Sequence, residues 1–209
     1  MTSRSPGMSG AQFVPNLALW EAWHPAEAAT WLADVDVVWY VTAGWAIDLF
    51  VGRQTREHED LEIAVPENQF EILRRALPGL EFFVVGGGVA QPVTAAALSA
   101  HQQTWARDIA SGNWRLDVFR EPWDGDTWVC RRDRRLRLPL PRAIARSADG
   151  IPYAQPEIVL LFKSKEVRPK DQNDFDAVLP LLDARRRQWL ADAIRLVDPT
   201  HRWLPALRM

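Results

Sequence analysis

The run TAGWAIDLFVGRQTREHEDLEIAV, residues 42–65, decides the fold of this chain. Asp60 and Glu62 flank one apolar residue, and the segment Leu61–Val65 has the composition of a β-strand, so the two carboxylates point to one face. Like charges side by side repel each other unless a cation lies between them, and Mg²⁺ takes oxygen ligands and binds phosphates. A glycine turn upstream, at Gly44, adds backbone N–H groups at a helix N-terminus. The run therefore predicts a combined metal and phosphate site.

Three motifs follow one another within this run: GWAID at Gly44–Asp48, GRQTREH at Gly52–His58 and DLE at Asp60–Glu62. In this order and spacing they resemble the nucleotidyltransferases of the DNA polymerase β superfamily, and most closely the aminoglycoside and lincosamide group (aminoglycoside-2''-adenylyltransferase-like). The chain departs from the pattern of that group twice. Ala43 stands where the first glycine of a pair is usual, and Glu62 stands where aspartate is commoner. Alanine restricts the backbone torsions that glycine allows at a turn.

The resemblance implies an α+β fold: a mixed-sheet, polymerase-β-like nucleotidyltransferase domain followed by a small C-terminal helical subdomain. Prolines and a polar stretch near residue 148 favour a boundary there. We therefore expect a flexible N-terminal tail over residues 1–12, the nucleotidyltransferase domain over 13–148 and the helical subdomain over 149–209. The C-terminal motifs PE, LLFK and KDQNDF, within residues 156–175, also resemble this group.

A third carboxylate is expected from a later strand, and Asp117 in WRLDVF, residues 114–119, is the best candidate. Alternation turns Leu116 and Val118 toward the core and Asp117 toward the cleft. The resemblance implies the same, because the family places its third acid in such a context. Three acids around one or two Mg²⁺ ions hold a nucleoside triphosphate and align an acceptor hydroxyl. Asp117 is also a candidate base for the hydroxyl proton.

Several residues are candidates for nucleotide contact. Arg56 and His58 precede the metal strand and are placed to meet the outer phosphates. A metal-ligand role for His58 is not expected, because Mg²⁺ prefers oxygen. Gly44 belongs to the phosphate turn, and Trp45 beside it is a candidate wall of the nucleotide pocket.

Two lysines in the C-terminal segment are further candidates. Lys165 falls on an apolar helix stripe with Ile158, Leu161 and Phe162, so its ammonium must snorkel or bind an anion. Lys163 lies on an adjacent face, and both lysines are candidate triphosphate contacts. Asp171 and Asp174 share a helix face, where such pairs usually meet solvent or pair with neighbouring cations, here Lys170 or Arg168.

Composition bounds the remaining possibilities. The chain has 209 residues, 47% of them hydrophobic, and a formal net charge of −2, so charge gives no argument for a nucleic acid or a membrane. A single cysteine, Cys130, rules out an internal disulfide framework. No apolar run reaches membrane-spanning length, and the first residues lack the apolar core of a signal peptide. We therefore expect a cytoplasmic protein, as a monomer or a homodimer.

The function expected from these residues and the resemblance is Mg²⁺-dependent transfer of a nucleoside monophosphate, AMP from ATP, to a hydroxyl of a small molecule. An aminoglycoside-like or lincosamide-like antibiotic is the acceptor that the resemblance implies. A catalytically degenerate nucleotide- or partner-binding protein is an alternative that Ala43 favours. A toxin-like nucleotidyltransferase acting on RNA is another, favoured by the basic run Arg131–Arg137, which otherwise indicates a solvated edge strand.

The pattern of apolar residues also predicts the order of the elements. A helix or a helix pair is expected over about 15–33, and further helices are expected over 45–51, from Pro66 to Leu77 and after Pro156. Strands are expected over 35–41, 61–65, 81–85 and 114–119, with a hairpin of 127–131 and 136–138 at the sheet edge.

Overall fold

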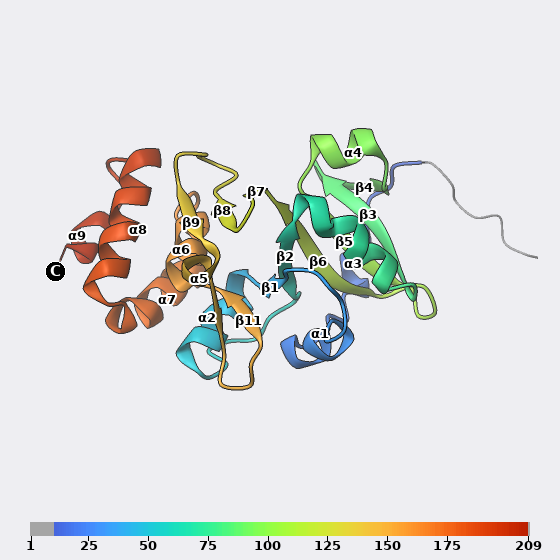
Figure 1. The fold of residues 1–209 in the computed structure, drawn as a ribbon, viewed down its shortest axis with the longest axis horizontal. Helices are drawn as coiled ribbons and strands as arrows, with labels where there is room; N and C mark the ends of the chain where they lie inside the picture. Colours follow the sequence, from blue (N-terminus) through green and yellow to red (C-terminus); the bar gives the residue numbers. More distant parts are fainter. Residues whose placement is uncertain (1–10, 209) are drawn as a thin grey trace, which may run out of the picture.

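The computed structural model describes residues 11–208 and is built around one large mixed sheet with a group of helices at one end (Figure 1). The eight strands of this sheet lie in the order β10-β11-β1-β2-β6-β5-β3-β4. Their bounds are β1 Tyr40–Val41, β2 Glu62–Pro66, β3 Leu80–Gly86, β4 Val89–Pro92, β5 Gln103–Asp108, β6 Trp114–Glu121, β10 Ile144–Arg146 and β11 Pro152–Ala154. Parallel pairing joins β2 to β6 and β1 to β11, and the other neighbours are antiparallel. The α+β fold with a mixed sheet is therefore confirmed.

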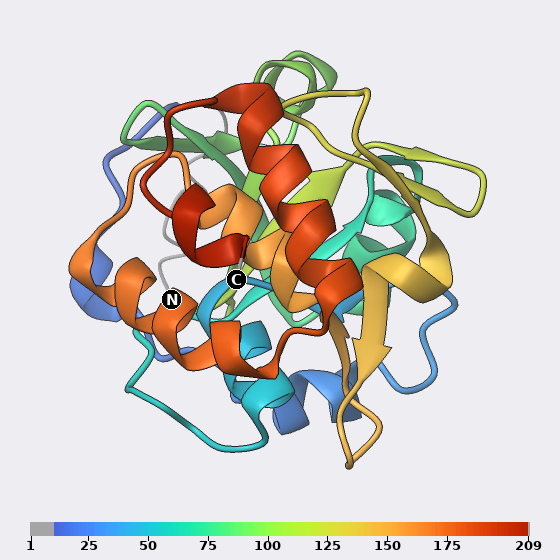
Figure 2. The same ribbon diagram turned by 90° about the vertical axis from the view of Figure 1, so that its left-hand side faces the viewer.

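Helices occupy the remainder of the chain. They are α1 Pro25–Trp31, α2 Ala43–Val51, α3 Phe70–Ala76, α4 Ala95–Ala100, α5 Leu140–Ala143, α6 Pro156–Lys163, α7 Pro169–Val178, α8 Ala184–Val197 and α9 Leu204–Leu207, with short 3₁₀ turns at Leu17–Leu19, Glu67–Gln69 and Leu179–Leu181. Figure 2 shows α8 and α9 in front of α6 at the C-terminal end. Among the described residues, no helix is long and apolar enough to cross a membrane.

The centre of the sheet is buried because its strands alternate as the sequence predicts. Leu61, Ile63 and Val65 on the β2 side and Leu116 and Val118 on β6 are fully buried. Their burial turns the neighbouring acids to the opposite face, and it fixes the register, because a one-residue slip would move every apolar side chain out of the core.

Three expected elements differ from the structure. Of the helix or helix pair expected over about 15–33, the structure has only a 3₁₀ turn at Leu17–Leu19 and the short helix α1, which Pro25 opens and a capping box of His24 and Glu27 starts. The strand expected over 35–41 contributes only Tyr40–Val41 to the sheet. The hairpin does form, but β8 Thr127–Val129 and β9 Arg137–Pro139 belong to a separate three-stranded sheet with β7 Trp123–Asp124.

The polar stretch at residues 147–150 is a turn within the large sheet. Ser147 and Gly150 close the connection between β10 and β11, with Gly150 at φ 79°. Strand β11 then pairs with β1, so the sheet continues past residue 148. The division into units at 13–148 and 149–209 stays a prediction, and most of the expected tail, 1–12, lies outside the described residues.

Candidate active site

Three carboxylates meet where β2 and β6 run side by side. Glu62 is paired with Asp117 in the parallel register, and Asp60 directly precedes β2. Each of the three offers one oxygen atom, and these atoms lie within 4.8 Å of one another. The structure thus brings together the three acids that alternation and the resemblance indicated. Asp60 and Glu62 line a cleft of about 520 Å³, whereas Asp117 is only 2% exposed and lies beneath the cleft floor.

The electrostatics of this cluster favour a bound cation. Burial and the nearby Asp60 raise the pKa of Glu62 to about 7. Burial and the neighbouring Glu62 carboxylate also raise the pKa of Asp117 well above its usual range. Without a cation, Glu62 and Asp117 therefore retain their protons to higher pH than ordinary carboxyl groups do, and a divalent ion would compete with those protons.

The donor set fits Mg²⁺. Oδ2 of Asp117 accepts a hydrogen bond of 2.5 Å from Gln103, whereas its Oδ1 is buried without a hydrogen-bond partner in the described part of the chain. A buried oxygen without a partner is costly unless an ion or donor reaches it. All three candidate ligands are oxygen atoms, which hard cations prefer. Asp60, Glu62 and Asp117 are therefore the residues that would hold the metal.

The N-terminus of α2 borders the acids. The N–H of Thr42, the N-cap residue, donates to the carbonyl of Glu62 at 2.8 Å, and the Thr42 side chain makes no capping hydrogen bond. The N–H groups of the first turn therefore remain available to an anion. Ala43 has φ 52°, the left-handed conformation that glycine adopts most easily. The alanine at this turn therefore has a backbone conformation that usually requires glycine.

Gly44 is needed for a close approach rather than for its torsion angles. A Cβ atom at this position would lie 2.2 Å from Nη2 of Arg56 and 2.6 Å from Nδ1 of His58. These distances are below any real contact, so glycine lets both side chains reach the start of α2. The predicted phosphate turn, Arg56 and His58 are therefore one cluster.

His58 is held from two sides. Its Nε2 lies 2.6 Å from Oδ2 of Asp48, and its ring stacks on Trp45 with centroids 4.3 Å apart. Asp48 is buried, and its other oxygen accepts hydrogen bonds from the backbone and side chain of Thr55. Burial lowers the pKa of His58, although the hydrogen bond with Asp48 opposes this effect. Asp48 thus fixes the loop before β2, a role that the sequence motif contained but that we did not predict.

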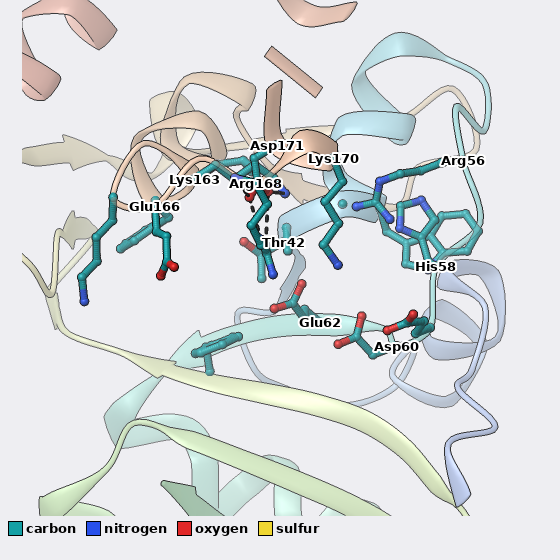
Figure 3. A pocket seen from close by; sticks show the side chains of 18 of the residues that line it. Thr42, Arg56, His58, Asp60, Glu62, Lys163, Glu166, Arg168, Lys170 and Asp171 are labelled. Atoms are coloured by element: carbon teal, nitrogen blue, oxygen red, sulfur yellow. Dashed lines mark hydrogen bonds and ion pairs between the residues drawn. The ribbon is translucent and has the colours of Figure 1, made fainter. Parts of the chain in front are cut away.

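A buried ion cluster forms the opposite wall of the cleft, on α6 and α7 (Figure 3). Nζ of Lys163 lies 2.8 Å from Asp171 and 2.9 Å from Asp174. Arg168 binds Asp171 at 2.7 Å, and Arg56 lies 3.5 Å from Asp174. Of the two interpretations of this aspartate pair, solvent exposure is wrong because both residues are buried, whereas the ion pair with Arg168 is observed at Asp171. Lys163 reaches the cleft, but these two carboxylates already neutralise its charge.

Lys165 and Lys170 are further exposed cations of this wall, besides the exposed Arg168 that pairs with Asp171. Helix α6 ends at Lys163, where Ser164 forms the C-cap, so Lys165 lies beyond the helix and the expected helical stripe is wrong for it. Lys165 still lines the cleft. Lys170, which we had considered only as an ion-pair partner, extends from α7 toward Asp60 and Glu62 (Figure 3).

Comparison with known proteins agrees with this geometry. Residues 26–93 match the family model described as aminoglycoside-2''-adenylyltransferase, and no curated protein matches the chain. The fold is similar to the lincomycin-bound crystal structure of the lincosamide antibiotic adenylyltransferase LnuA, with TM-score 0.52 and 17% identity over 73% of this chain and 92% of that one. It is also similar to ANT(2'')-Ia in complex with adenylyl-2''-tobramycin, with TM-score 0.55 and 15% identity over 82% of this chain and 95% of that one.

The resemblance to aminoglycoside and lincosamide nucleotidyltransferases is therefore confirmed. The matched residues include α2, the Arg56 loop and β2, and the neighbours share the fold. Together these findings support a nucleotidyltransferase enzyme.

Proposed function

We propose that this protein transfers AMP from ATP to a hydroxyl group of a small molecule, with Mg²⁺ bound by Asp60, Glu62 and Asp117. The observation that carries the proposal is the meeting of three carboxylate oxygens within 4.8 Å beside the uncapped N-terminus of α2. Bound Mg²⁺ supplies charge neutralisation on the phosphates and orients them. An antibiotic of the aminoglycoside or lincosamide type is the acceptor class that the similar structures suggest.

The residues of the chain have separate roles in this reaction. The first turn of α2, with Gly44 and Trp45, receives the outer phosphates through backbone N–H groups. Arg56 adjoins that turn and meets the negative charge that grows on the leaving pyrophosphate, and His58, which Asp48 holds, lies beside it. The acceptor oxygen forms a bond to the α-phosphorus as the bond to the bridging oxygen breaks. Pyrophosphate leaves with that electron pair, and the hydroxyl proton passes to a site carboxylate and then to water.

Asp117 is better suited to hold the metal than to contact the acceptor. Its carboxylate is almost fully buried and Gln103 holds one of its oxygens. A base must come within hydrogen-bond reach of the proton that it removes, and the more exposed Asp60 and Glu62 border the cleft itself. We therefore assign Asp117 mainly to metal binding, and its role as the base for the hydroxyl proton is secondary.

The two alternative functions have less support. Ala43 favoured a degenerate site, but its backbone adopts the left-handed conformation that a glycine would adopt there most easily. The basic run Arg131–Arg137 favoured an RNA substrate. Within it Arg135 pairs with Asp133 and Arg137 with Asp124, and Arg131 turns into the cleft.

Calorimetric titration of the protein with ATP at saturating Mg²⁺ tests the proposal. We expect binding that is lost without Mg²⁺ and strongly weakened in Asp60→Asn. Glu71→Gln is a matched control, because Glu71 lies on α3 outside the cleft and pairs only with Arg74 among the described residues. Equal Mg²⁺-ATP binding by the parent and Asp60→Asn would show that the acid cluster has no part in nucleotide binding.

A further inference from the structure

The end of the cleft beyond Asp117 has a different chemistry from the metal end. Along β6 the same alternation that exposes Asp117 to the acids turns Phe119 and Glu121 into the cleft. Glu121 is 4% exposed and accepts hydrogen bonds from Tyr40 Oη at 2.6 Å and from Trp128 Nε1. These donors come from β1 and β8, so the carboxylate is fixed from two sheets.

Glu121 in turn holds Arg131. Nη1 of Arg131 donates to Oε1 of Glu121 at 3.0 Å. The guanidinium lies over the ring of Phe119 at 4.6 Å and over the ring of Phe162 at 4.4 Å. The guanidinium is therefore held between two aromatic rings and by a carboxylate, so Arg131 and its neighbours form a rigid surface and the arginine is not mobile. We call these four residues the aromatic-arginine subsite.

Two more cations border this subsite. The guanidinium of Arg132 lies 4.8 Å from the ring centre of Phe162 and donates to the Phe162 carbonyl at 2.7 Å, and Lys165 is exposed beside it. Neither forms an ion pair in the part of the chain described. A second cavity of about 140 Å³ shares Arg132 and Lys165 with the cleft. Its other lining residues are mostly apolar: Cys130, Leu136, Leu161, Ser164, Val197 and Asp198.

The topology places this subsite on the acceptor side of the reaction. The strands lie in the order β1-β2-β6, and α2 directly follows β1. In the proposed function the outer phosphates bind at the start of α2, which lies on the β1 side of β2, whereas β6 lies on the other side. In-line transfer brings the incoming oxygen to the α-phosphorus from the side opposite the leaving pyrophosphate. The acceptor must therefore approach from the β6 side, where Phe119 follows Asp117.

We propose that the aromatic-arginine subsite binds the acceptor, and that this acceptor is a hydroxyl compound with a flat or apolar ring, neutral or anionic, rather than a polycation. This inference rests on the proposed nucleotidyl transfer and narrows its substrate class. The aromatic rings and the smaller cavity offer an apolar surface. The carboxylate of Glu121 already has three donors and is unavailable to an amine. Arg132 and Lys165 repel clustered ammonium groups at this end. Among the described residues, the exposed acids lining the cleft are Glu166 and, on the Arg56 loop, Glu57 and Glu59.

The test compares three acceptor probes: tobramycin, phenyl β-D-glucoside and phenyl β-D-glucuronide. Each is added to the protein with Mg²⁺-ATP, and acceptor-dependent pyrophosphate release and the adenylylated product are measured. We expect both phenyl glycosides to outperform tobramycin in kcat/KM, and the glucuronide to be the better of the two. A higher kcat/KM for tobramycin, or no transfer to either glycoside by a protein that binds Mg²⁺-ATP, would overturn the inference. Failure to bind Mg²⁺-ATP would instead reject the proposed function.

Charge and aromatic variants locate the effect. Lys165→Glu should lower the preference for glucuronide over glucoside by about three- to tenfold, the range of a single partly exposed charge contact. Arg134→Glu is the matched control, because Arg134 belongs to the same basic run but does not line the cleft, and it should leave the preference unchanged. Phe119→Leu tests the aromatic part of the subsite. It should raise KM for both glycosides about three- to tenfold with ATP binding intact, which is the fold-change expected when one aromatic contact is lost. Equal preferences in the parent and Lys165→Glu, or an unchanged KM in Phe119→Leu, would contradict the assignment.

Discussion

The two walls of the cleft hold their buried charges in opposite states. On the sheet wall Asp60, Glu62 and Asp117 crowd together, with pKa values raised at Glu62 and Asp117. On the helical wall the buried charges are already neutralised by one another, as Lys163 is between Asp171 and Asp174. The sheet wall therefore needs a ligand that the chain does not provide, whereas the buried cluster of the helical wall is complete without one. A charge removed from the sheet wall should cost activity, and one removed from the buried cluster of the helical wall should cost stability.

The largest expected effect is loss of transfer on the sheet wall. Asp60→Asn and Asp117→Asn should lower nucleotide transfer on the order of 10³-fold, because they remove ligands of the cation that stabilises phosphate charge. The melting temperature of the metal-free protein should hold or rise, because one of several repelling carboxylates is gone. Pyrophosphate release and a thermal melt in chelator measure the two outcomes. Unchanged transfer in either variant would exclude that residue from the mechanism.

The opposite pattern is expected from the helical wall. Burial alone would raise the pKa of Asp171, but hydrogen bonds from Arg168 and Lys163 outweigh it and lower the pKa to about 2. Asp171→Asn should therefore destabilise the protein by about 3 kcal/mol, as does breaking a buried ion pair.

Urea unfolding measures this free energy. The control is Asp192→Asn, which breaks the exposed pair with Arg195 on α8 and should cost about 0.5 kcal/mol or less. If both variants lose the same free energy of unfolding, the buried ion cluster of the helical wall contributes no more to stability than an exposed ion pair does.

Metal and pH should act together on the sheet wall. Folding raises the pKa of Glu62 from 4.5 to about 7, so the folded state binds this proton more tightly than the unfolded state. The resulting stability is fully present below about pH 4.5 and is lost as the pH rises through about 7. We expect Mg²⁺ to raise the melting temperature clearly at pH 8 and little at pH 5. A Mg²⁺ effect that is equal at both values, or larger at pH 5, would contradict the carboxylate site.

The sheet wall was largely predictable from sequence because its residues are close in the chain or fixed by alternation. Asp60 and Glu62 are two residues apart, and Asp117 follows from the apolar residues on either side of it. Strand β5, which lies between β3 and β6 in the sheet, was not predicted, because it buries only small or polar side chains such as Thr104 and Ala106. Such a strand has no strong apolar pattern.

The helical wall and the acceptor end were harder to predict for a different reason. The position of Lys165 depended on where α6 ends, and helix ends are uncertain by a residue or two in any sequence pattern. In the sequence, Arg131 belongs to a basic run that indicated a solvated edge strand. Its role depends on Phe162 and on a carboxylate, Glu121, that is fixed by residues of other strands. Contacts between distant segments leave no local pattern.

The exposed and the buried lysine of the helical wall offer a finer comparison. Lys170→Met removes a cation that faces Asp60 and Glu62 across the cleft and should weaken ATP binding about tenfold, since a charge-assisted contact contributes about 1.5–3 kcal/mol. Its folding free energy should barely change.

Lys163→Met should do the reverse, because it leaves two buried carboxylates without their shared partner. ATP calorimetry at fixed salt, paired with urea unfolding, separates the two. A Lys163→Met protein with normal stability and weakened ATP binding would move Lys163 from the scaffold to the triphosphate site.

The smallest effect concerns Ala43 at the entrance of the sheet wall. Its φ of 52° is a left-handed conformation that costs an L-residue about 1–2 kcal/mol. Glycine would remove this strain, but it would also raise the entropy of the unfolded chain, which offsets part of the gain in stability. Ala43→Gly should therefore stabilise the protein by about 0.5–1 kcal/mol.

Gly52 gives the matched reverse experiment for this torsional argument. It has φ 80° at the end of α2, and a Cβ added there would meet nothing within 4 Å, so Gly52→Ala changes backbone strain alone. It should destabilise the protein by about 1 kcal/mol. Because Ala43 already adopts the left-handed turn, Mg²⁺-ATP affinity should stay within about twofold of the parent in Ala43→Gly, less than the tenfold that ~1.4 kcal/mol would give. Binding that tightened by tenfold or more would show that the alanine holds the phosphate turn away from its working geometry, and the degenerate alternative would regain its support.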